Sequence, residues 1–299
     1  MKSHTTGNLM GLISIVIWST VIAFSRSLVE ELGTFTSGGS VYLAGGALSL
    51  GLLWLRHRGF SWTRGFATRY LLTCGGLFVL YEVMLYLAIG LSTTRQQTLE
   101  VGLINYLWIS FTFAFSVPVL KKKAGWPLIA GMVMAVAGVA IATLPPGYSL
   151  AELQTNLQQH GAPYLLSLGC AVSWGLYSNL SRKWGSESGE SAVPIFLLAT
   201  GLTLLGLRLF AVEQSHWSTT SVAQLIYVAL LPTTVAYIAW DIAMRRGNLI
   251  LIASLSYIIP LASTIISSIL LHVTMSANLW IACILVIAGA VVCRYSVKD

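Results

Sequence analysis

Ten apolar stretches, each about as long as a membrane-crossing helix, follow one another along the chain with short polar breaks between them. A helix needs about 20 mostly apolar residues to cross the hydrocarbon core of a bilayer. The stretches lie at residues 9–29, 36–55, 69–91, 97–119, 124–144, 163–183, 191–211, 221–244, 248–271 and 276–295. The sequence therefore predicts an all-α integral membrane protein with ten transmembrane helices.

The composition excludes most soluble classes of protein. Charged residues make up only 9% of the chain, whereas a soluble protein carries roughly 25%. The surface must therefore face lipid, and soluble enzymes, nucleic-acid binders and secreted disulfide scaffolds are excluded. The four cysteines fall in or beside apolar stretches without metal-ligand or redox spacing, so we expect buried thiols and no metal or cofactor.

The basic residues predict the orientation of the helices. Cytoplasmic loops of membrane proteins carry an excess of Lys and Arg. With the N-terminus in the cytoplasm, only Arg26, Arg95 and Arg208 of the 17 Lys and Arg residues face the outside. We therefore expect both termini in the cytoplasm, and the net charge of +7 reflects topology rather than nucleic-acid binding.

Three short patterns recur in the same order in the two halves of the chain. They are Trp-x6-Ser-Arg at Trp18 and Trp174, Asn/Ser-Tyr at Tyr106 and Tyr257, and an Ala/Gly/Val segment at 137–140 and 288–291. The offsets are 156, 151 and 151 residues, so the sequence predicts a duplication. Chance similarity between helices of like composition is the alternative interpretation.

A duplication of five helices has a consequence for topology. The expected repeats cover residues 1–145 and 163–299, joined by an outer-side linker at 146–162. Because each repeat has an odd number of spans, the two copies enter the membrane from opposite sides. Inverted repeats of this kind are typical of transporters that work by alternating access.

Glu82 is the most unusual residue within the predicted spans. It lies 13 residues after Arg69, which places it ~20 Å into the bilayer at the rise of an α-helix. A carboxylate at that depth is costly unless it faces water or a partner. Glu82 is expected to meet a substrate ammonium group or carry a coupling proton; the alternative is a protonated side chain bonded to a neighbouring helix.

Aromatic side chains within the spans, rather than at the ends, suggest a central cavity. Rings with one polar group suit a cavity that stacks a flat side chain, although packing between helices is the alternative for any single ring. The candidate substrate-binding residues are Trp18, Tyr81, Glu82, Asn105, Tyr106, Trp108, Trp174, Tyr237, Trp240 and Tyr257. Asn105 is expected to meet a substrate carboxylate, and Pro260, within helix nine, is the candidate hinge.

Helices five and ten carry small residues in place of polar ones. Gly131 and Gly138 on one, and Gly289 on the other, provide smooth faces for close packing. These helices are expected to form either a scaffold or the surface of a homodimer. No motif of a hydrolase, a metalloprotease or a phosphate-binding loop is present in the sequence, so no enzymatic activity is expected.

Two segments carry a resemblance to a known family. They are Thr93-Thr94-Arg95-Gln96-Gln97 followed by Glu100-Val101-Gly102-Leu103-Ile104-Asn105-Tyr106-Leu107-Trp108, and Ala239-Trp240-Asp241-Ile242 followed by Gly247-Asn248. On these segments and its ten spans, the whole chain resembles the EamA-type drug/metabolite transporters. The resemblance implies a bacterial inner-membrane exporter of amino acids, aromatic ones favoured, with a cavity between its halves. Export of cationic drugs or other metabolites on the same fold is the alternative.

Overall fold

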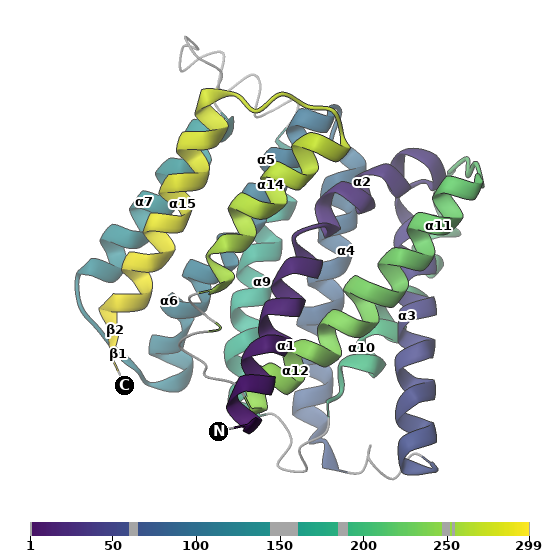
Figure 1. Ribbon diagram of the computed structural model, residues 1–299, viewed down its shortest axis with the longest axis horizontal. Helices are drawn as coiled ribbons and strands as arrows, with labels where there is room; N and C mark the ends of the chain where they lie inside the picture. The colour runs from purple at the N-terminus through teal and green to yellow at the C-terminus, as the bar shows by residue number, and fades with distance from the viewer. Residues whose placement is uncertain are drawn as a thin grey trace.

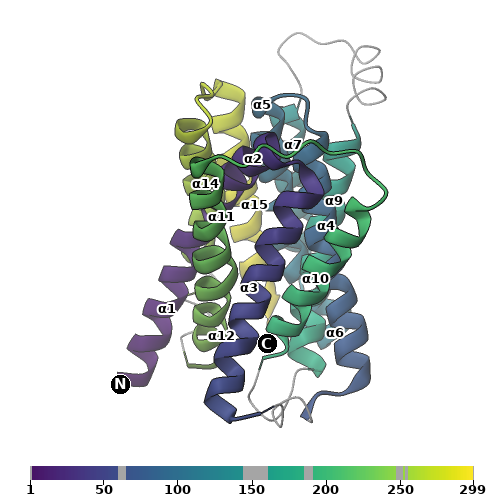
Figure 2. The same ribbon diagram turned by 90° about the vertical axis from the view of Figure 1, so that its right-hand side faces the viewer.

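The computed structural model describes residues 2–59, 65–143, 161–184, 191–246, 252 and 255–298, with only the backbone for 2–4, 241–242 and 244–246. These residues form a bundle of helices (Figures 1 and 2). The start of α1 and the end of the chain both lie toward the lower end of the bundle in Figure 1. The predicted linker at 146–162 falls, up to residue 160, outside the described residues.

The first half of the chain forms helices and one π-helical segment. In order these are α1 (Lys2–Trp18), α2 (Val21–Leu32), α3 (Thr34–His57), the π-helical η2 (Tyr70–Cys74), α4 (Gly75–Leu91), α5 (Arg95–Asn105), α6 (Trp108–Leu120) and α7 (Pro127–Thr143). A short strand, β1 (Lys123–Ala124), precedes α7 and pairs with β2 (Val297–Lys298) in antiparallel fashion.

The second half of the chain is likewise helical, with one π-helical segment among the elements described. Its elements are α9 (Ala162–Trp184), α10 (Val193–Arg208), α11 (Thr219–Val228), the π-helical η3 (Ala229–Val235), α12 (Ala236–Arg246), α14 (Ile258–Leu270) and α15 (Ala277–Ser296). The prediction of an all-helical protein is thus confirmed, apart from the two-residue strands.

Several helices have the length and apolar character needed to cross a membrane. Within the described residues there are six: Thr5–Leu32, Thr34–His57, Tyr70–Leu91, Arg95–Leu120, Thr219–Trp240 and Ala277–Ser296. Three shorter apolar helices accompany them, at Pro127–Thr143, Val193–Arg208 and Ile258–Leu270. The protein is therefore a multi-pass membrane protein.

Several of the predicted spans are not regular helices. The span at 9–29 turns at Ser19 and Thr20, whose hydroxyls donate to the carbonyls of Ile15 and Ile17. Such bonds from Ser and Thr compete with the helical ladder and bend helices. The span at 97–119 breaks at Tyr106, and the span at 221–244 contains η3, where a proline removes a backbone donor.

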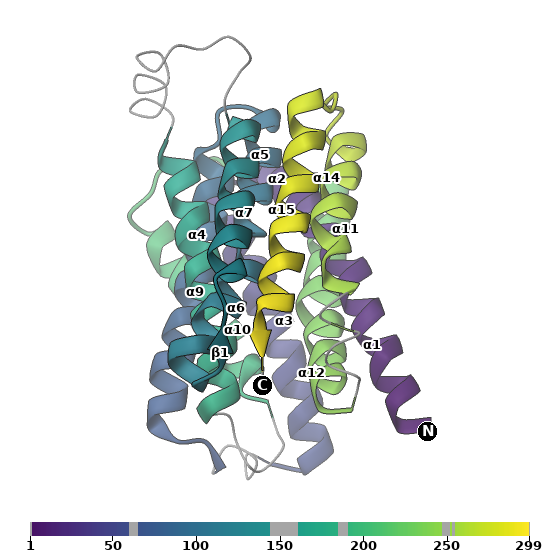
Figure 3. The ribbon, with the colours of Figure 1, turned by 90° about the vertical axis from the view of Figure 1, so that its left-hand side faces the viewer.

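Helices α7 and α15 pack closely side by side (Figure 3). A Cβ atom on Gly289 would lie 2.5 Å from the carbonyl oxygen of Gly131, and one on Gly138 would lie 2.9 Å from that of Ala282. The smooth faces expected from the sequence are therefore buried against each other within one chain. This agrees with a scaffold role; a homodimer through these helices stays a prediction.

Candidate functional site

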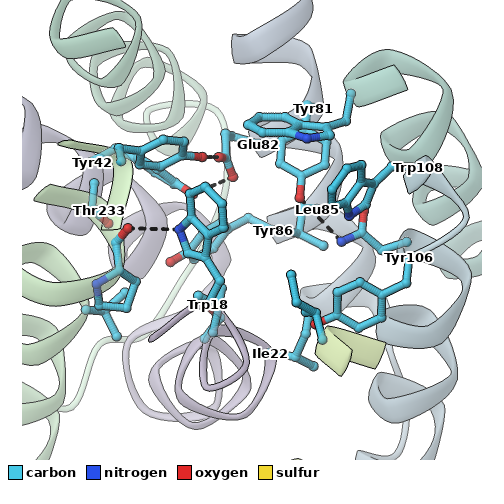
Figure 4. Close-up of a pocket in the computed structure, with 18 residues that line it drawn as sticks. Trp18, Ile22, Tyr42, Tyr81, Glu82, Leu85, Tyr86, Tyr106, Trp108 and Thr233 are labelled. Carbon is cyan, nitrogen blue, oxygen red and sulfur yellow. Dashed lines mark hydrogen bonds between the residues drawn. The ribbon is translucent and has the colours of Figure 1, made fainter. Parts of the chain in front are cut away.

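A cavity of about 70 Å³ lies between helices of both halves (Figure 4). Its lining residues are Trp18, Val21, Ile22, Ser25, Tyr42, Tyr81, Glu82, Leu85, Tyr86, Asn105, Tyr106, Trp108, Trp174, Val228, Pro232, Thr233, Tyr237 and Ile259. Ligand pockets usually measure about 300–1,000 Å³. In this conformation the cavity has room for a few water molecules but not for an amino acid.

Eight of the ten candidate site residues line this cavity; Trp240 and Tyr257 do not. Trp240 packs on the ring of Trp18, with 5.2 Å between ring centroids, and so supports the wall without forming it. Tyr257 is buried in a cluster with Ile109 and Ala290. These two residues belong to the packing around the site.

Glu82 faces the cavity from α4 and is only 2% exposed. Its Oε1 atom accepts a hydrogen bond of 2.8 Å from the hydroxyl of Tyr237 on α12, and its Oε2 atom accepts one from the hydroxyl of Tyr42 on α3. Burying a carboxyl group without such partners costs several kcal/mol. Both oxygens are therefore held in place by neighbouring helices, one from each half of the chain, as Figure 4 shows for Tyr42.

Aromatic rings form a continuous wall around Trp174. The ring centroid of Trp174 lies 4.7 Å from that of Tyr81, 5.0 Å from that of Tyr177 and 6.4 Å from that of Trp108. On the other side, Trp18 packs edge to face on Tyr237. Packing between rings and exposure to a cavity, which the sequence left as alternatives, are therefore both true of these side chains.

Asn105 ends α5 at the break before α6 and is 3% exposed. Its Nδ2 atom donates a hydrogen bond of 3.3 Å to the hydroxyl of Tyr81, whereas its Oδ1 atom is buried without a partner. Buried polar atoms nearly always have a partner. An unsatisfied acceptor that lines a cavity is therefore suited to a ligand that brings a donor.

Pro260 lies in the first turn of α14, immediately after the break at Tyr257. The sequence placed this proline inside a continuous helix, which is wrong, because at the first turn a missing N–H interrupts no helical bond. Its carbonyl accepts a bond of 2.7 Å from the hydroxyl of Thr264. A hinge role for Pro260 stays a prediction.

Sequence reasoning missed several residues of the cavity wall. The polar ones are Ser25, Tyr42, Tyr86 and Thr233, and the apolar ones are Val21, Ile22, Leu85, Val228, Pro232 and Ile259. Tyr42 met the criterion applied to the other rings, because it lies within the predicted span 36–55. The small apolar residues carry no signal in a sequence rich in them.

The charges around the cavity are unequal. The residues that line it include one carboxyl group, Glu82, and no Lys, Arg or His. Among the described residues no cluster of three or more His, Cys, Asp or Glu could hold a metal ion. The site can therefore bind a cationic group directly, whereas an anionic group must find neutral donors.

A network of ion pairs lies at the upper end of the bundle in Figure 1, called here the Glu30 end. Glu30 of α2 pairs with Arg26 at 2.8 Å and with Arg95 of α5 at 2.7 Å. Arg26 also donates to the carbonyls of Ile89 and Ser92, at the end of α4. Arg95 reaches the carbonyl of Leu271 after α14, so the network joins the two halves of the chain.

Comparison with known proteins identifies relatives of the whole chain. The EamA-like transporter family matches residues 5–144 and again residues 161–295. The chain is 32% identical to the aromatic amino acid exporter YddG of Salmonella typhimurium, with 95% of each chain covered. It is 31% identical to the exporter of that name from Ancylobacter novellus, with 97% of each covered.

A solved crystal structure resembles the fold along its length. It superposes with a TM-score of 0.69 at 26% sequence identity, and 97% of each chain is covered. The family match spans nearly all of the described helices, including every helix that lines the cavity. The chain therefore belongs to the EamA-like transporter family.

Proposed function

We propose that the protein exports amino acids, aromatic ones in preference, across the bacterial inner membrane by alternating access. The observation that carries the proposal is a buried carboxyl group, Glu82, that faces a cavity walled by tryptophan and tyrosine rings. The rings would stack an aromatic side chain, and the carboxylate would bind the ammonium group. Relatives named aromatic amino acid exporters support this substrate class.

The architecture we propose for this activity is ten helices in two inverted repeats, with both termini in the cytoplasm. Two features support it. The family matches the chain twice in succession. In addition, α4 packs on α9 and α1 packs on α12. In the proposed repeats, α4 corresponds to α12 and α9 corresponds to α1. The two contacts are therefore the same contact, made once by each repeat.

Alternating access accounts for the size of the cavity. At about 70 Å³ it cannot hold an amino acid until its walls separate. The walls come from both halves of the chain, so a movement of one half against the other would open the cavity toward one side of the membrane at a time. The two hydroxyls that hold Glu82 also come from opposite halves.

Organic cations are the second candidate cargo. The cavity has a carboxyl group and no basic residue in its wall, which favours a cation over a zwitterion as far as formal charge is concerned. A ring-lined site also stabilises a cation through the faces of the rings. The aromatic amino acid remains the first candidate because it is the named substrate of the relatives that cover the whole chain.

Counterflow in proteoliposomes tests the proposal. Liposomes that contain the purified protein and excess unlabelled tryptophan should accumulate external labelled tryptophan, and empty liposomes should not. Unlabelled phenylalanine and tyrosine should compete more strongly than alanine. Competition by an aromatic quaternary ammonium ion but not by tryptophan would favour the second candidate, and no counterflow of either would contradict both.

A further inference from the structure

Three half-helices begin at the wall of the cavity. They are α2, which starts at Val21, α6, which starts at Trp108, and α14, which starts at Ile258. Val21, Trp108 and the neighbouring Ile259 line the cavity, and none of the three helix starts has a side-chain cap. The start of a helix carries partial positive charge and N–H groups directed along the helix axis.

Ser25 adds a hydroxyl to the first of these helix starts. It lies one turn after Val21 on the same face of α2, and both residues line the cavity. The Cα–Cβ bond of a helical residue tilts toward the N-terminus of its helix, which brings the Ser25 side chain toward the first turn of α2. The residue is 1% exposed and its Oγ atom makes no hydrogen bond of ordinary geometry, although the hydroxyl of Tyr86 lies near it.

An amino acid brings a carboxylate that the cavity must accommodate. No Lys, Arg or His lines the wall, so no full positive charge is available. Asn105, expected from the sequence to meet this group, donates one N–H of its amide to Tyr81, which leaves a single neutral N–H on this side chain. The start of α2, with the Ser25 hydroxyl beside it, adds N–H and O–H donors that carry no formal charge.

We propose that the first turn of α2 and the hydroxyl of Ser25 form the subsite for the carboxylate of the substrate. This inference rests on the proposed function and specifies how a zwitterion is oriented. The carboxylate faces α2, the ammonium group faces Glu82 on α4, and the side chain lies among the rings. Neutral donors and the helix dipole then replace the missing basic residue.

The test compares substrates with and without a carboxylate. Tryptophan and tryptamine share the indole ring and the amine, and only tryptophan has the carboxylate. Their half-maximal concentrations for inhibiting labelled tryptophan counterflow are measured with wild-type protein and with Ser25→Ala. Because Ser25→Ala removes a hydrogen bond to a charged group, the half-maximal concentration of tryptophan should rise about tenfold in this variant. The half-maximal concentration of tryptamine should stay within about twofold of its wild-type value, because tryptamine has no carboxylate for Ser25 to bind.

Ser181 provides a matched control. It stands 156 residues after Ser25, at the repeat-related position on α9, and it does not line the cavity. Its Oγ atom likewise makes no hydrogen bond of ordinary geometry, although the thiol of Cys74 lies near it. Ser181→Ala should leave both inhibition constants unchanged. If wild-type protein does not bind tryptamine, the two variants are compared with tryptophan alone. A loss of tryptophan affinity in Ser25→Ala but not in Ser181→Ala then supports the carboxylate subsite, and no such difference contradicts it.

The outcomes separate this inference from the proposed function. An equal loss for both compounds in Ser25→Ala, or no loss for tryptophan, would overturn the carboxylate subsite while leaving transport intact. Wild-type protein that moves neither compound would overturn the proposed function, and the subsite with it. The melting temperature of each variant in detergent shows that a changed constant does not reflect misfolding.

Discussion

Trp18 of one half of the chain packs edge to face on Tyr237 of the other, with 5.2 Å between ring centroids. A contact between the same two residue types occurs with the halves exchanged: Trp174 packs on Tyr81 in a tilted arrangement, with 4.7 Å between ring centroids. The two tryptophans are 156 residues apart in sequence, and so are the two tyrosines. Each half thus covers a tyrosine of the other with a tryptophan at the wall of the cavity.

This relationship predicts a matched pair of coupling energies. Double-mutant cycles with Leu substitutions at Trp18 and Tyr237, and at Trp174 and Tyr81, should each give about 0.5–1.5 kcal/mol of coupling beyond area burial. Unfolding of the purified protein in mixed detergent micelles would provide the free energies. The mixed cycle of Trp18 with Tyr81 is the control and should give coupling near zero. Similar values for matched and mixed cycles would contradict a specific contact across the halves.

Glu82→Gln removes the proposed binding group for the ammonium while keeping the shape of the side chain. Because only the ionised carboxylate attracts an ammonium group strongly, we expect the variant to lose most of its tryptophan counterflow. Whatever activity remains should depend less on pH than wild-type activity does, because the amide of Gln carries no titratable proton. Counterflow at a series of pH values is the measurement.

Glu100→Gln is the control for Glu82→Gln. Glu100 is also a poorly exposed carboxyl group, and it accepts a bond of 2.5 Å from the hydroxyl of Tyr164, but it does not line the cavity. The substitution should affect transport and its pH dependence less than Glu82→Gln. Identical pH profiles in wild type and Glu82→Gln would exclude the proposed role of Glu82.

Local signals explain what the sequence could predict. Apolar stretches identify the helices, and rings or a carboxyl group inside such a stretch identify most of the polar cavity wall. The break at Ser19 was not predictable, because it depends on which carbonyl a hydroxyl bonds. The role of Tyr42 in the site was not predictable either, because only the packing of α3 against α4 brings its hydroxyl to Glu82. Trp240 was assigned to the cavity because a sequence does not show which side of a ring faces inward.

Gly289→Val should destabilise the protein without reaching the cavity. The new side chain would enter the contact between α15 and α7, where a Cβ atom already lies 2.5 Å from the carbonyl of Gly131. Overpacking of this kind typically costs about 1–3 kcal/mol, so the melting temperature in detergent should fall by several degrees. Gly206→Ala on α10 is the control, because its Cβ atom would meet nothing within 4 Å. An unchanged melting temperature for Gly289→Val would show that the two helices separate readily.

The Glu30 end of the bundle is expected to open during transport, because the hydrogen bond from Arg95 to the carbonyl of Leu271 joins the two halves there. Arg95→Gln removes one arm of the network and the bond from Arg95 to the carbonyl of Leu271. The Arg95–Glu30 pair is partly exposed, with 45% and 28% of the two side chains accessible, so its loss should cost no more than about 1 kcal/mol of stability. A small change in stability can still shift the balance between two conformations of the bundle severalfold.

Thiol labelling measures that shift. A cysteine placed at Thr233, in the cavity wall, should react severalfold faster with a membrane-impermeant maleimide in the Arg95→Gln background, because the cavity would open more often. The native cysteines are buried and should add little background labelling. Arg69→Gln is the control: it removes a cation–π contact with Trp184 at the opposite end of the bundle and should leave labelling from the Glu30 end unchanged. Equal labelling rates with and without Arg95 would mean that this network stabilises the fold but does not gate the cavity.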